Sequence, residues 1–312
     1  MSILLAERFS DAFREELRAA RLPFVYLPNP PKAELLQAVA DVRILVVKSK
    51  PRVDRKLIEA APHLVGVIRG GSGLEHIDQQ ALKKRSIRLI GTPQGNCDAV
   101  GEQAVGMLLN LFQKLNQADH QVRQFIWNRK ENTGIELMNR TVGIIGYGHT
   151  GQAFARRLSG FGCKILAWDK YRFDYSDNWA QAAPLVQIQQ EADVISLHLP
   201  LTEETRAYAD TAFFHSFAKP FWLLNLSRGE QVVMPALIEA LQSGRVLGAA
   251  LDVFENEDFS QLTEAQRYEI FALSRMENVL LTPHTGGLTI ESAARIEQHV
   301  LQAIHEMLGG GS

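Results

Sequence analysis

The sequence Thr141-Val-Gly-Ile-Ile-Gly-Tyr-Gly-His-Thr-Gly151 joins an apolar run to a glycine-rich loop, and residues 152–158 continue it with helical spacing. A strand, a Gly-x-Gly-x-x-Gly loop and a helix in this order are typical of a dinucleotide-binding unit. Gly146 permits the tight turn, Gly148 lets a pyrophosphate approach the backbone, and Gly151 lets the helix pack on the strand. The stretch therefore predicts a dinucleotide cofactor site in an α/β sheet.

The start of the predicted helix and the end of the next strand specify the cofactor. The backbone N–H groups at His149 and Thr150 would face its phosphates at the positive end of the helix. Asp169 follows the next strand, about twenty residues after the loop, where a carboxylate binds the adenine ribose and repels a 2′-phosphate. The sequence therefore predicts NAD rather than NADP, although Lys170 and Arg172 follow at once and would soften that preference.

Short apolar runs alternate with amphipathic stretches along the chain, as expected for parallel sheets covered by helices. The strands predicted before the glycine loop are residues 3–6, 24–27, 44–47, 64–68 and 87–90. The strands predicted from the loop onward are residues 141–145, 164–168, 194–197, 222–226, 246–251 and 279–281. Six strands are the count for a complete dinucleotide-binding sheet. Single helices are predicted over residues 99–124 and 289–307.

This order of elements predicts an α/β fold with two domains. A Rossmann-type doubly wound parallel sheet is expected over residues 99–282. It is inserted into a second, flavodoxin-like α/β domain for the substrate, which is expected to comprise residues 1–98 and 283–312.

The composition excludes several classes of partner. A formal net charge of -2 gives no general field that attracts nucleic acid or an anionic membrane. No apolar stretch approaches the ~20 residues needed to span a bilayer, and the apolar run at the N-terminus is too short for a signal peptide. Cys97 and Cys163 lack metal-like spacing and fit reduced thiols. A cytoplasmic protein without a metal site is therefore expected.

Three polar residues follow late strands of the predicted cofactor sheet, where such sheets carry their chemistry. They are Arg228, Glu257 and His284. A guanidinium can clamp the carboxylate and C2 oxygen of a 2-hydroxy acid. An imidazole can take the hydroxyl proton as hydride leaves C2, and a carboxylate can hold that imidazole in one tautomer. Each residue alone has a plain alternative as a loop or surface residue, but together they predict hydride transfer between NAD and a small 2-hydroxy or 2-oxo acid.

With these residues in place, the chain resembles the D-2-hydroxyacid dehydrogenase family over nearly its whole length. The resemblance is carried by residues 70–78, 146–151, 225–229, 251–257 and 282–287. It implies that Arg228, Glu257 and His284 are catalytic and that Asp252 contacts the nicotinamide carboxamide. The other implied cofactor contacts, around the nicotinamide ribose, are His198, Pro200 and Thr205. The implied substrate loop, whose backbone N–H groups would hold the carboxylate, is Gly70, Gly71, Ser72 and Gly73. The chain departs from the family pattern at two places. Asp258 stands where the family usually has proline, and His149-Thr150 replace the commoner arginine and isoleucine of the glycine loop.

Within the family, the chain is most similar to short-form D-3-phosphoglycerate dehydrogenases of serine biosynthesis. Lys48, Arg69 and Arg129 fall where those enzymes carry bases, and they predict a phosphorylated substrate. If these cations are ordinary solvated charges, glyoxylate or hydroxypyruvate becomes the better candidate. A remote alternative is a non-catalytic NAD(H)-sensing protein of the same fold. The resemblance also implies a homodimer, with the helix predicted over residues 99–124 in its interface.

Overall fold

A computed structural model describes residues 2–309, and the chain divides into two compact units. Unit 1 comprises Met1–Cys97 and Leu288–Ser312, and unit 2 comprises Asp98–Gly287. The second border therefore lies after residue 287, later than the predicted border after residue 282. The reason is local, because the backbone N–H groups of Thr285 and Gly286 donate to the Asp252 carboxylate at 2.9 and 2.8 Å and hold this segment in unit 2.

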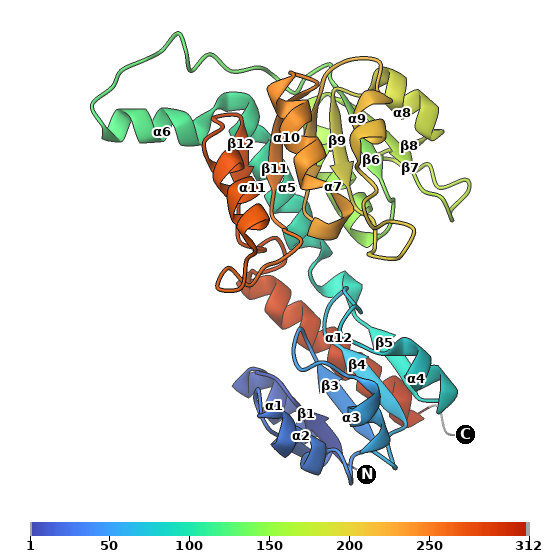
Figure 1. The fold of residues 1–312 in the computed structure, drawn as a ribbon. Coiled ribbons are helices and arrows are strands. Elements are labelled where there is room, and N and C mark those ends of the chain that lie inside the picture. The colour runs from blue at the N-terminus through green and yellow to red at the C-terminus, as the bar shows by residue number, and fades with distance from the viewer. Residues whose placement is uncertain (1, 310–312) are drawn as a thin grey trace. The chain divides into compact units, whose positions relative to one another are not determined.

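Unit 1 is built on five parallel strands in the order β2-β1-β3-β4-β5 (Figure 1). The strands are β1 (Ile3–Leu5), β2 (Phe24–Tyr26), β3 (Ile44–Val47), β4 (Gly66–Arg69) and β5 (Arg88–Gly91). This is the flavodoxin-like order. Helices cover both faces, so the central strand β3 is buried along its whole length. One face carries α2 (Lys32–Ala38), α3 (Arg55–Glu59) and α4 (Gln79–Lys84), and the other carries α1 (Asp11–Ala19) and α12 (Ile290–Gly309).

Unit 2 is built on seven parallel strands in the order β12-β11-β10-β9-β6-β7-β8. The strands are β6 (Thr141–Ile145), β7 (Lys164–Trp168), β8 (Gln181–Ala182), β9 (Val194–Leu197), β10 (Phe221–Asn225), β11 (Val246–Leu251) and β12 (Val279–Leu281). Counted from β6, this is the doubly wound order with one further edge strand, so the predicted fold class is confirmed. The predicted count of six strands is wrong. It missed β8, whose two residues are too few to show a strand pattern.

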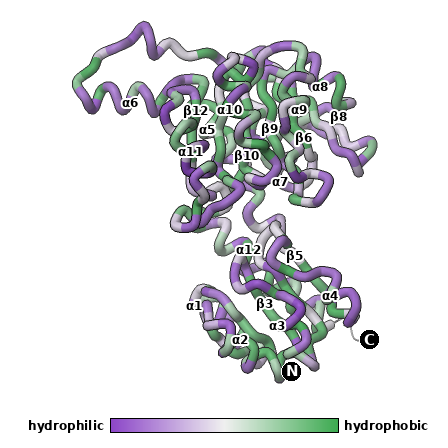
Figure 2. Tube along the Cα trace, in the orientation of Figure 1, coloured by the Kyte–Doolittle hydropathy of each residue, from purple (hydrophilic) through white to green (hydrophobic). Residues whose placement is uncertain are grey.

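Both faces of the unit 2 sheet are covered by helices. One face carries α5 (Cys97–Gln113) and α7 (His149–Leu158). The other carries α8 (Leu185–Glu191), α9 (Thr211–His215), α10 (Met234–Gln242) and α11 (Glu264–Ser274). Within residues 2–309 there are also short 3-10 helices, η1 (Pro93–Gly95) in unit 1 and η2 (Ser159–Phe161) and η3 (Gly229–Gln231) in unit 2. In Figure 2 the hydrophobic colour runs along the central strands, where the cores lie. No helix within residues 2–309 has the length and apolar character needed to cross a membrane.

The single helix predicted over residues 99–124 is two helices, which corrects that prediction. The chain breaks at Lys114, whose φ of 52° is left-handed, and α6 (Leu115–Arg123) begins after it. Helix α5 buries one face in the core, whereas α6 buries no residue. Helix α6 and the segment after it extend away from the sheet of unit 2 (Figure 1).

Candidate active site

The glycine loop after β6 makes two contacts that leave no room for a side chain. Gly146 has a φ of 93°, and a Cβ on it would lie 2.6 Å from the carbonyl oxygen of His198. A Cβ on Gly151 would lie 2.3 Å from the carbonyl oxygen of Gly146, so α7 packs directly on the turn. Gly148 differs, because no atom lies within 4 Å of the place its Cβ would take. The loop therefore presents an open backbone face, which fits a pyrophosphate.

Helix α7 begins at this open face, with Gly148 as its N-cap. His149 is exposed and Thr150 is half-buried. The backbone N–H of Gln152 donates to the carbonyl oxygen of Gly148 at 3.0 Å. The N–H groups before it, in the first turn, have no acceptor within the helix and suit an anion. The two predicted phosphate contacts thus stand at the positive end of a helix that faces open space.

Asp169 follows β7 and is tied to the glycine loop. Its Oδ2 accepts the backbone N–H of Tyr147 at 2.9 Å. The Arg172 guanidinium donates to the carbonyl oxygen of Tyr147, and Lys170 forms an ion pair with Glu204. Both cations that follow Asp169 therefore have partners in the chain. The negative charge of Asp169 lies at the strand end where such folds bind the adenine ribose.

His198 follows β9, and its side chain belongs to the core. It is 7% exposed, its Nε2 lies 2.8 Å from Ser196 Oγ, and its ring packs against Phe154. Burial lowers the pKa of His198 to about 4, so the ring is neutral at physiological pH. Its side chain is thus not presented to a cofactor, and only its backbone borders the glycine loop. In the turn that follows, Thr205 Oγ1 donates to the carbonyl oxygen of Pro200 at 2.6 Å and fixes the backbone.

Arg228 leaves β10 in a loop that is held on two sides. Asn225 is buried, and its Nδ2 donates to the carbonyl oxygen of Arg228 at 2.9 Å. A Cβ on Gly229 would lie 1.9 Å from the carbonyl carbon of Phe254. The loop therefore packs backbone to backbone against the segment that leads to Glu257. This packing brings the predicted arginine and glutamate segments together.

His284 and Glu257 are joined by a hydrogen bond of 2.8 Å between Nδ1 and Oε2. This bond raises the pKa of His284 above its ordinary value, and the nearby positive charge of Arg228 opposes the rise. The His284 backbone has a left-handed φ of 53°, and its N–H donates to the carbonyl oxygen of Asp252 at 2.7 Å. The two side chains are 44% and 45% exposed, so a substrate can reach them. The structure thus brings together the three predicted catalytic residues within unit 2.

Asp252, the predicted nicotinamide contact, is 1% exposed and surrounded by donors from the chain. Its carboxylate accepts from the side chains of Gln103 at 2.8 Å and of Thr282, and from the backbone N–H groups of Thr285 at 2.9 Å and Gly286 at 2.8 Å. These bonds anchor the segment that carries His284. The sequence did not reveal the part played by Gln103, because it lies on α5, 149 residues before Asp252.

Of the predicted phosphate contacts, Lys48 directly follows β3, and Arg69 is the last residue of the neighbouring strand β4 in unit 1. Val47 and Arg69 are register partners. Lys48 Nζ donates to the carbonyl oxygen of Arg8 at 2.8 Å and lies 3.6 Å from the carboxylate of Glu297. The two residues therefore lie at the carboxyl ends of adjacent strands. Arg69 is level with Val47, whereas the Lys48 ammonium lies over the Phe9 ring on the face of the sheet that carries α1 and α12. Lys48, however, already has an acidic partner.

The predicted substrate loop, residues 70–73, lies beneath Arg69. The guanidinium of Arg69 donates to the carbonyl oxygen of the next residue at 3.0 Å. Gly71 has a φ of 126°, and its N–H donates to Thr92 Oγ1 at 2.8 Å. Because that N–H group already donates a hydrogen bond, the backbone N–H groups of Ser72 and Gly73 are the better donors for a substrate carboxylate. Arg129, the third predicted cation, is exposed in unit 2 after α6.

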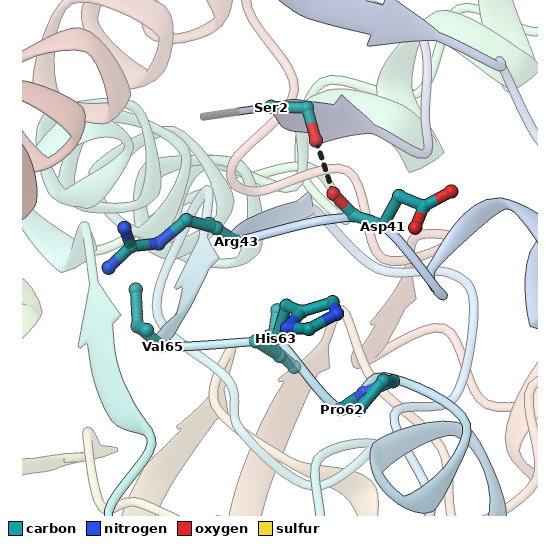
Figure 3. Close-up of a pocket in the computed structure, with 7 residues that line it drawn as sticks. Ser2, Asp41, Arg43, Pro62, His63 and Val65 are labelled. Atoms are coloured by element: carbon teal, nitrogen blue, oxygen red, sulfur yellow. Dashed lines mark hydrogen bonds between the residues drawn. The ribbon is translucent and has the colours of Figure 1, made fainter.

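A hollow on unit 1 lies at the opposite edge of its sheet. It is lined by Ser2, Asp41, Arg43, Pro62, His63, Leu64 and Val65 (Figure 3). Ser2 Oγ donates across it to the carbonyl oxygen of Asp41 at 2.6 Å. These residues precede strands β1, β3 and β4, whereas open α/β sheets bind ligands at the carboxyl ends of their strands. The hollow is therefore separate from the candidate site.

Comparisons with known proteins bear on the family and the fold of the chain. A family model described as "D-isomer specific 2-hydroxyacid dehydrogenase, NAD binding domain" matches residues 105–286. Hydroxypyruvate reductase of Thermotoga maritima is 34% identical over 89% of this chain and 89% of its own. D-3-phosphoglycerate dehydrogenase of Mycobacterium leprae is 32% identical over 91% of this chain, which spans 53% of that relative. The crystal structure of Aquifex aeolicus D-lactate dehydrogenase with NAD and lactic acid matches with a TM-score of 0.84 and 25% identity, over 99% of this chain and 96% of that one.

Proposed function

The chain belongs to the D-isomer-specific 2-hydroxyacid dehydrogenase family, and we propose that it interconverts D-3-phosphoglycerate and 3-phosphohydroxypyruvate with NAD. The observation that carries the proposed chemistry is the hydrogen-bonded pair of His284 and Glu257 with the charge of Arg228 beside it. A base, an acid that orients it and a guanidinium are the groups that hydride transfer at a hydroxy acid requires.

His284 moves the proton of the substrate hydroxyl. In oxidation, its neutral imidazole takes the proton from the C2 oxygen, and in reduction its imidazolium returns it. Glu257 at Nδ1 leaves Nε2 for this transfer and stabilises the charged ring. Arg228 binds the substrate carboxylate and C2 oxygen with a planar pair of N–H donors. The protein thereby holds the reacting oxygen while its charge changes.

The chemistry that a bound nicotinamide cofactor would supply is a hydride acceptor, NAD, for oxidation at C2 and a hydride donor, NADH, for reduction. The open loop of residues 146–151 would hold its pyrophosphate, and Asp169 its adenine ribose. The turn from Pro200 to Thr205 would border the nicotinamide ribose. Asp252 contributes by fixing the backbone of His284 rather than by presenting a free carboxylate.

The proposed phosphate contacts are Lys48 and Arg69, and residues 70–73 are proposed to bind the substrate carboxylate from unit 1. The register of β3 and β4 supports the first assignment, because it sets the two cations at adjacent strand ends. Two cations at the same end of a sheet suit a dianionic phosphate, which a single charge binds less well. Arg129 is a third proposed contact, for which the support is the sequence pattern.

A second candidate is the reduction of an unphosphorylated acid such as hydroxypyruvate or glyoxylate. It is favoured by two carboxylates beside Lys48. Glu7 accepts the backbone N–H groups of Lys48 and of Lys50, and Glu297 lies 3.6 Å from Lys48 Nζ. A cation that is already paired gains less from a phosphate, and the Thermotoga maritima relative is a hydroxypyruvate reductase.

A screen of NADH oxidation with phosphohydroxypyruvate, hydroxypyruvate, glyoxylate and pyruvate tests the proposal. We expect the phosphorylated acid to have the highest kcat/KM. Lys48→Met should lower kcat/KM for both acids, and the loss should be at least about tenfold larger for phosphohydroxypyruvate than for hydroxypyruvate. A difference of this size is expected when one charge-assisted hydrogen bond is lost. Lys50→Met is the matched control. Equal or better turnover of the unphosphorylated acids would select the second candidate, and NADH binding without any turnover would indicate a sensor.

We also propose that the protein is a homodimer. No residue of helix α6 is buried, and α6 and the segment after it expose apolar side chains. Exposed apolar side chains that lie together are typical of a surface that packs against another chain. The family resemblance points to the same region.

A further inference from the structure

A buried glutamine connects the loop after β9 with the loop after β10. Gln231 ends η3, three residues after Arg228, and its side chain has no solvent exposure. Because β9 and β10 are adjacent parallel strands, their following loops leave the same sheet edge side by side. One of these loops carries the proposed substrate arginine, and the other is the proposed border of the nicotinamide ribose.

The Gln231 amide uses all of its polar atoms within this junction. Nε2 donates to the carbonyl oxygens of Leu199 at 2.9 Å and of Pro200 at 3.2 Å. Oε1 accepts from Ser227 Oγ at 2.5 Å. An amide that is fully buried and fully satisfied holds its partners firmly, because breaking any one bond leaves a buried polar group unpaired.

The contacts continue from Ser227 to the arginine. The backbone N–H of Ser227 donates to Asn225 Oδ1 at 3.1 Å, and Asn225 Nδ2 donates to the carbonyl oxygen of Arg228 at 2.9 Å. The path from the Leu199 carbonyl to the Arg228 backbone is therefore a continuous set of hydrogen bonds between buried or half-buried groups. Backbone hydrogen bonds of 2.8 Å from Ala207 and Ala209 to the carbonyl oxygens of Glu230 and Gln231 also join the two segments, and the Gln231 side chain adds the contacts next to Leu199 and Arg228.

We propose that Gln231 is a positioning residue that holds Arg228 at a fixed distance from the nicotinamide end of the cofactor. This inference rests on the proposed function for the role of Arg228. Hydride transfer depends on the distance between C2 and the nicotinamide, and a displacement of about 1 Å can cost roughly a hundredfold in rate. Gln231 touches neither substrate nor cofactor, so its effect passes through the two loops that it joins.

The test is Gln231→Met, which keeps the length of the side chain and removes its three hydrogen bonds. We expect kcat per NADH-binding site to fall roughly 10- to 100-fold. Titration calorimetry should show NADH bound roughly three- to tenfold more weakly, with ADP-ribose, which lacks the nicotinamide, bound as before. Ser227→Ala, a milder change to the same junction, should shift both measurements in the same direction. It also serves if Gln231→Met fails to fold.

The control is Gln189→Met on α8, which removes a side-chain amide bond of 2.9 Å to Ser216 Oγ away from the site. It should leave kcat per site and the ratio of the two affinities unchanged. Gln231 is only structural if its variants lose folded protein but keep kcat per site and that ratio. If the unmodified protein reduces no 2-oxo acid, the proposed function is wrong. The ratio of the NADH affinity to the ADP-ribose affinity then still decides whether Gln231 positions the turn at Leu199 and Pro200.

Discussion

The hydrogen bond from His284 to Glu257 determines the pH range in which the proposed proton transfer works. Glu257 raises the pKa of His284, and reduction requires the protonated ring. Activity in reduction is therefore retained up to this raised pKa and lost as pH rises through it. The stability that the pair contributes has the same sign: it is complete below the ordinary pKa of histidine and is lost as pH rises through the raised value. Because both side chains are nearly half exposed, the stability effect is small.

Glu257→Gln should move the alkaline limb of the reduction profile to lower pH. The variant removes the largest cause of the raised pKa of His284, and kcat/KM at neutral pH should fall on the order of tenfold. The profile of kcat/KM against pH measures both effects. Glu255→Gln, two residues earlier and exposed, is the control and should keep the profile of the unmodified enzyme. A limb that stays in place in Glu257→Gln would show that another group titrates.

Asp169→Asn should relax the choice between NADH and NADPH. The substitution removes the charge that repels a 2′-phosphate, and it keeps an oxygen that can accept the N–H of Tyr147. The ratio of kcat/KM with NADPH to that with NADH should rise on the order of tenfold. Asp174→Asn, an exposed acid in the same loop, is the matched control. An unchanged ratio in Asp169→Asn would assign the selectivity to another residue.

At the scale of elements, the sequence predicts what local patterns encode and misses what depends on neighbours. The strands around the glycine loop were predictable because their residues are uniformly apolar and bounded by turns. The break at Lys114 was not, because no glycine or proline marks it and apolar spacing continues on both sides. Strand β8 exists through its pairing with β7 rather than through a pattern of its own. The junction made by Gln231 is of the same kind, since two of its partners, Leu199 and Pro200, lie 32 and 31 residues away in the chain.

The η3 segment packs so closely on the segment after β11 that one added methyl group at Gly229 should lower the stability of the protein. In Gly229→Ala, the new Cβ would overlap the backbone around Phe254, which cannot move without displacing the chain toward Glu257. We expect a loss of about 1–3 kcal/mol in the free energy of unfolding, measured in urea. Activity should fall as well, since the arginine and glutamate loops are forced apart. Gly160→Ala has nothing within 4 Å of its Cβ and should leave both unchanged. Equal stability of the two variants would contradict this packing.

At the scale of the whole molecule, the order of elements predicted two parallel sheets, with the glycine loop opening the second. The grouping of Arg228, Glu257 and His284 was predictable because each of the three residues follows a strand of that second sheet. The charge balance at the edge of unit 1 was not predictable. Glu297 reaches Lys48 from α12, at the far end of the chain, and no spacing in the sequence relates the two. The proposed substrate choice therefore rests on a contact that only the folded chain reveals.

The proposed homodimer predicts that the exposed apolar segment after α6 is covered in solution. Phe125 is fully exposed and Trp127 is 79% exposed in the single chain. Leaving such side chains in water is unfavourable, so burying them against a second copy would stabilise a dimer. Sedimentation velocity should give the mass of two chains for the unmodified protein, and of one chain for the double variant Phe125→Glu, Trp127→Glu. Phe173→Glu places the same charge on another exposed aromatic residue and should remain dimeric. If the unmodified protein is monomeric, the proposed dimer is wrong. If the double variant stays dimeric, the interface lies elsewhere.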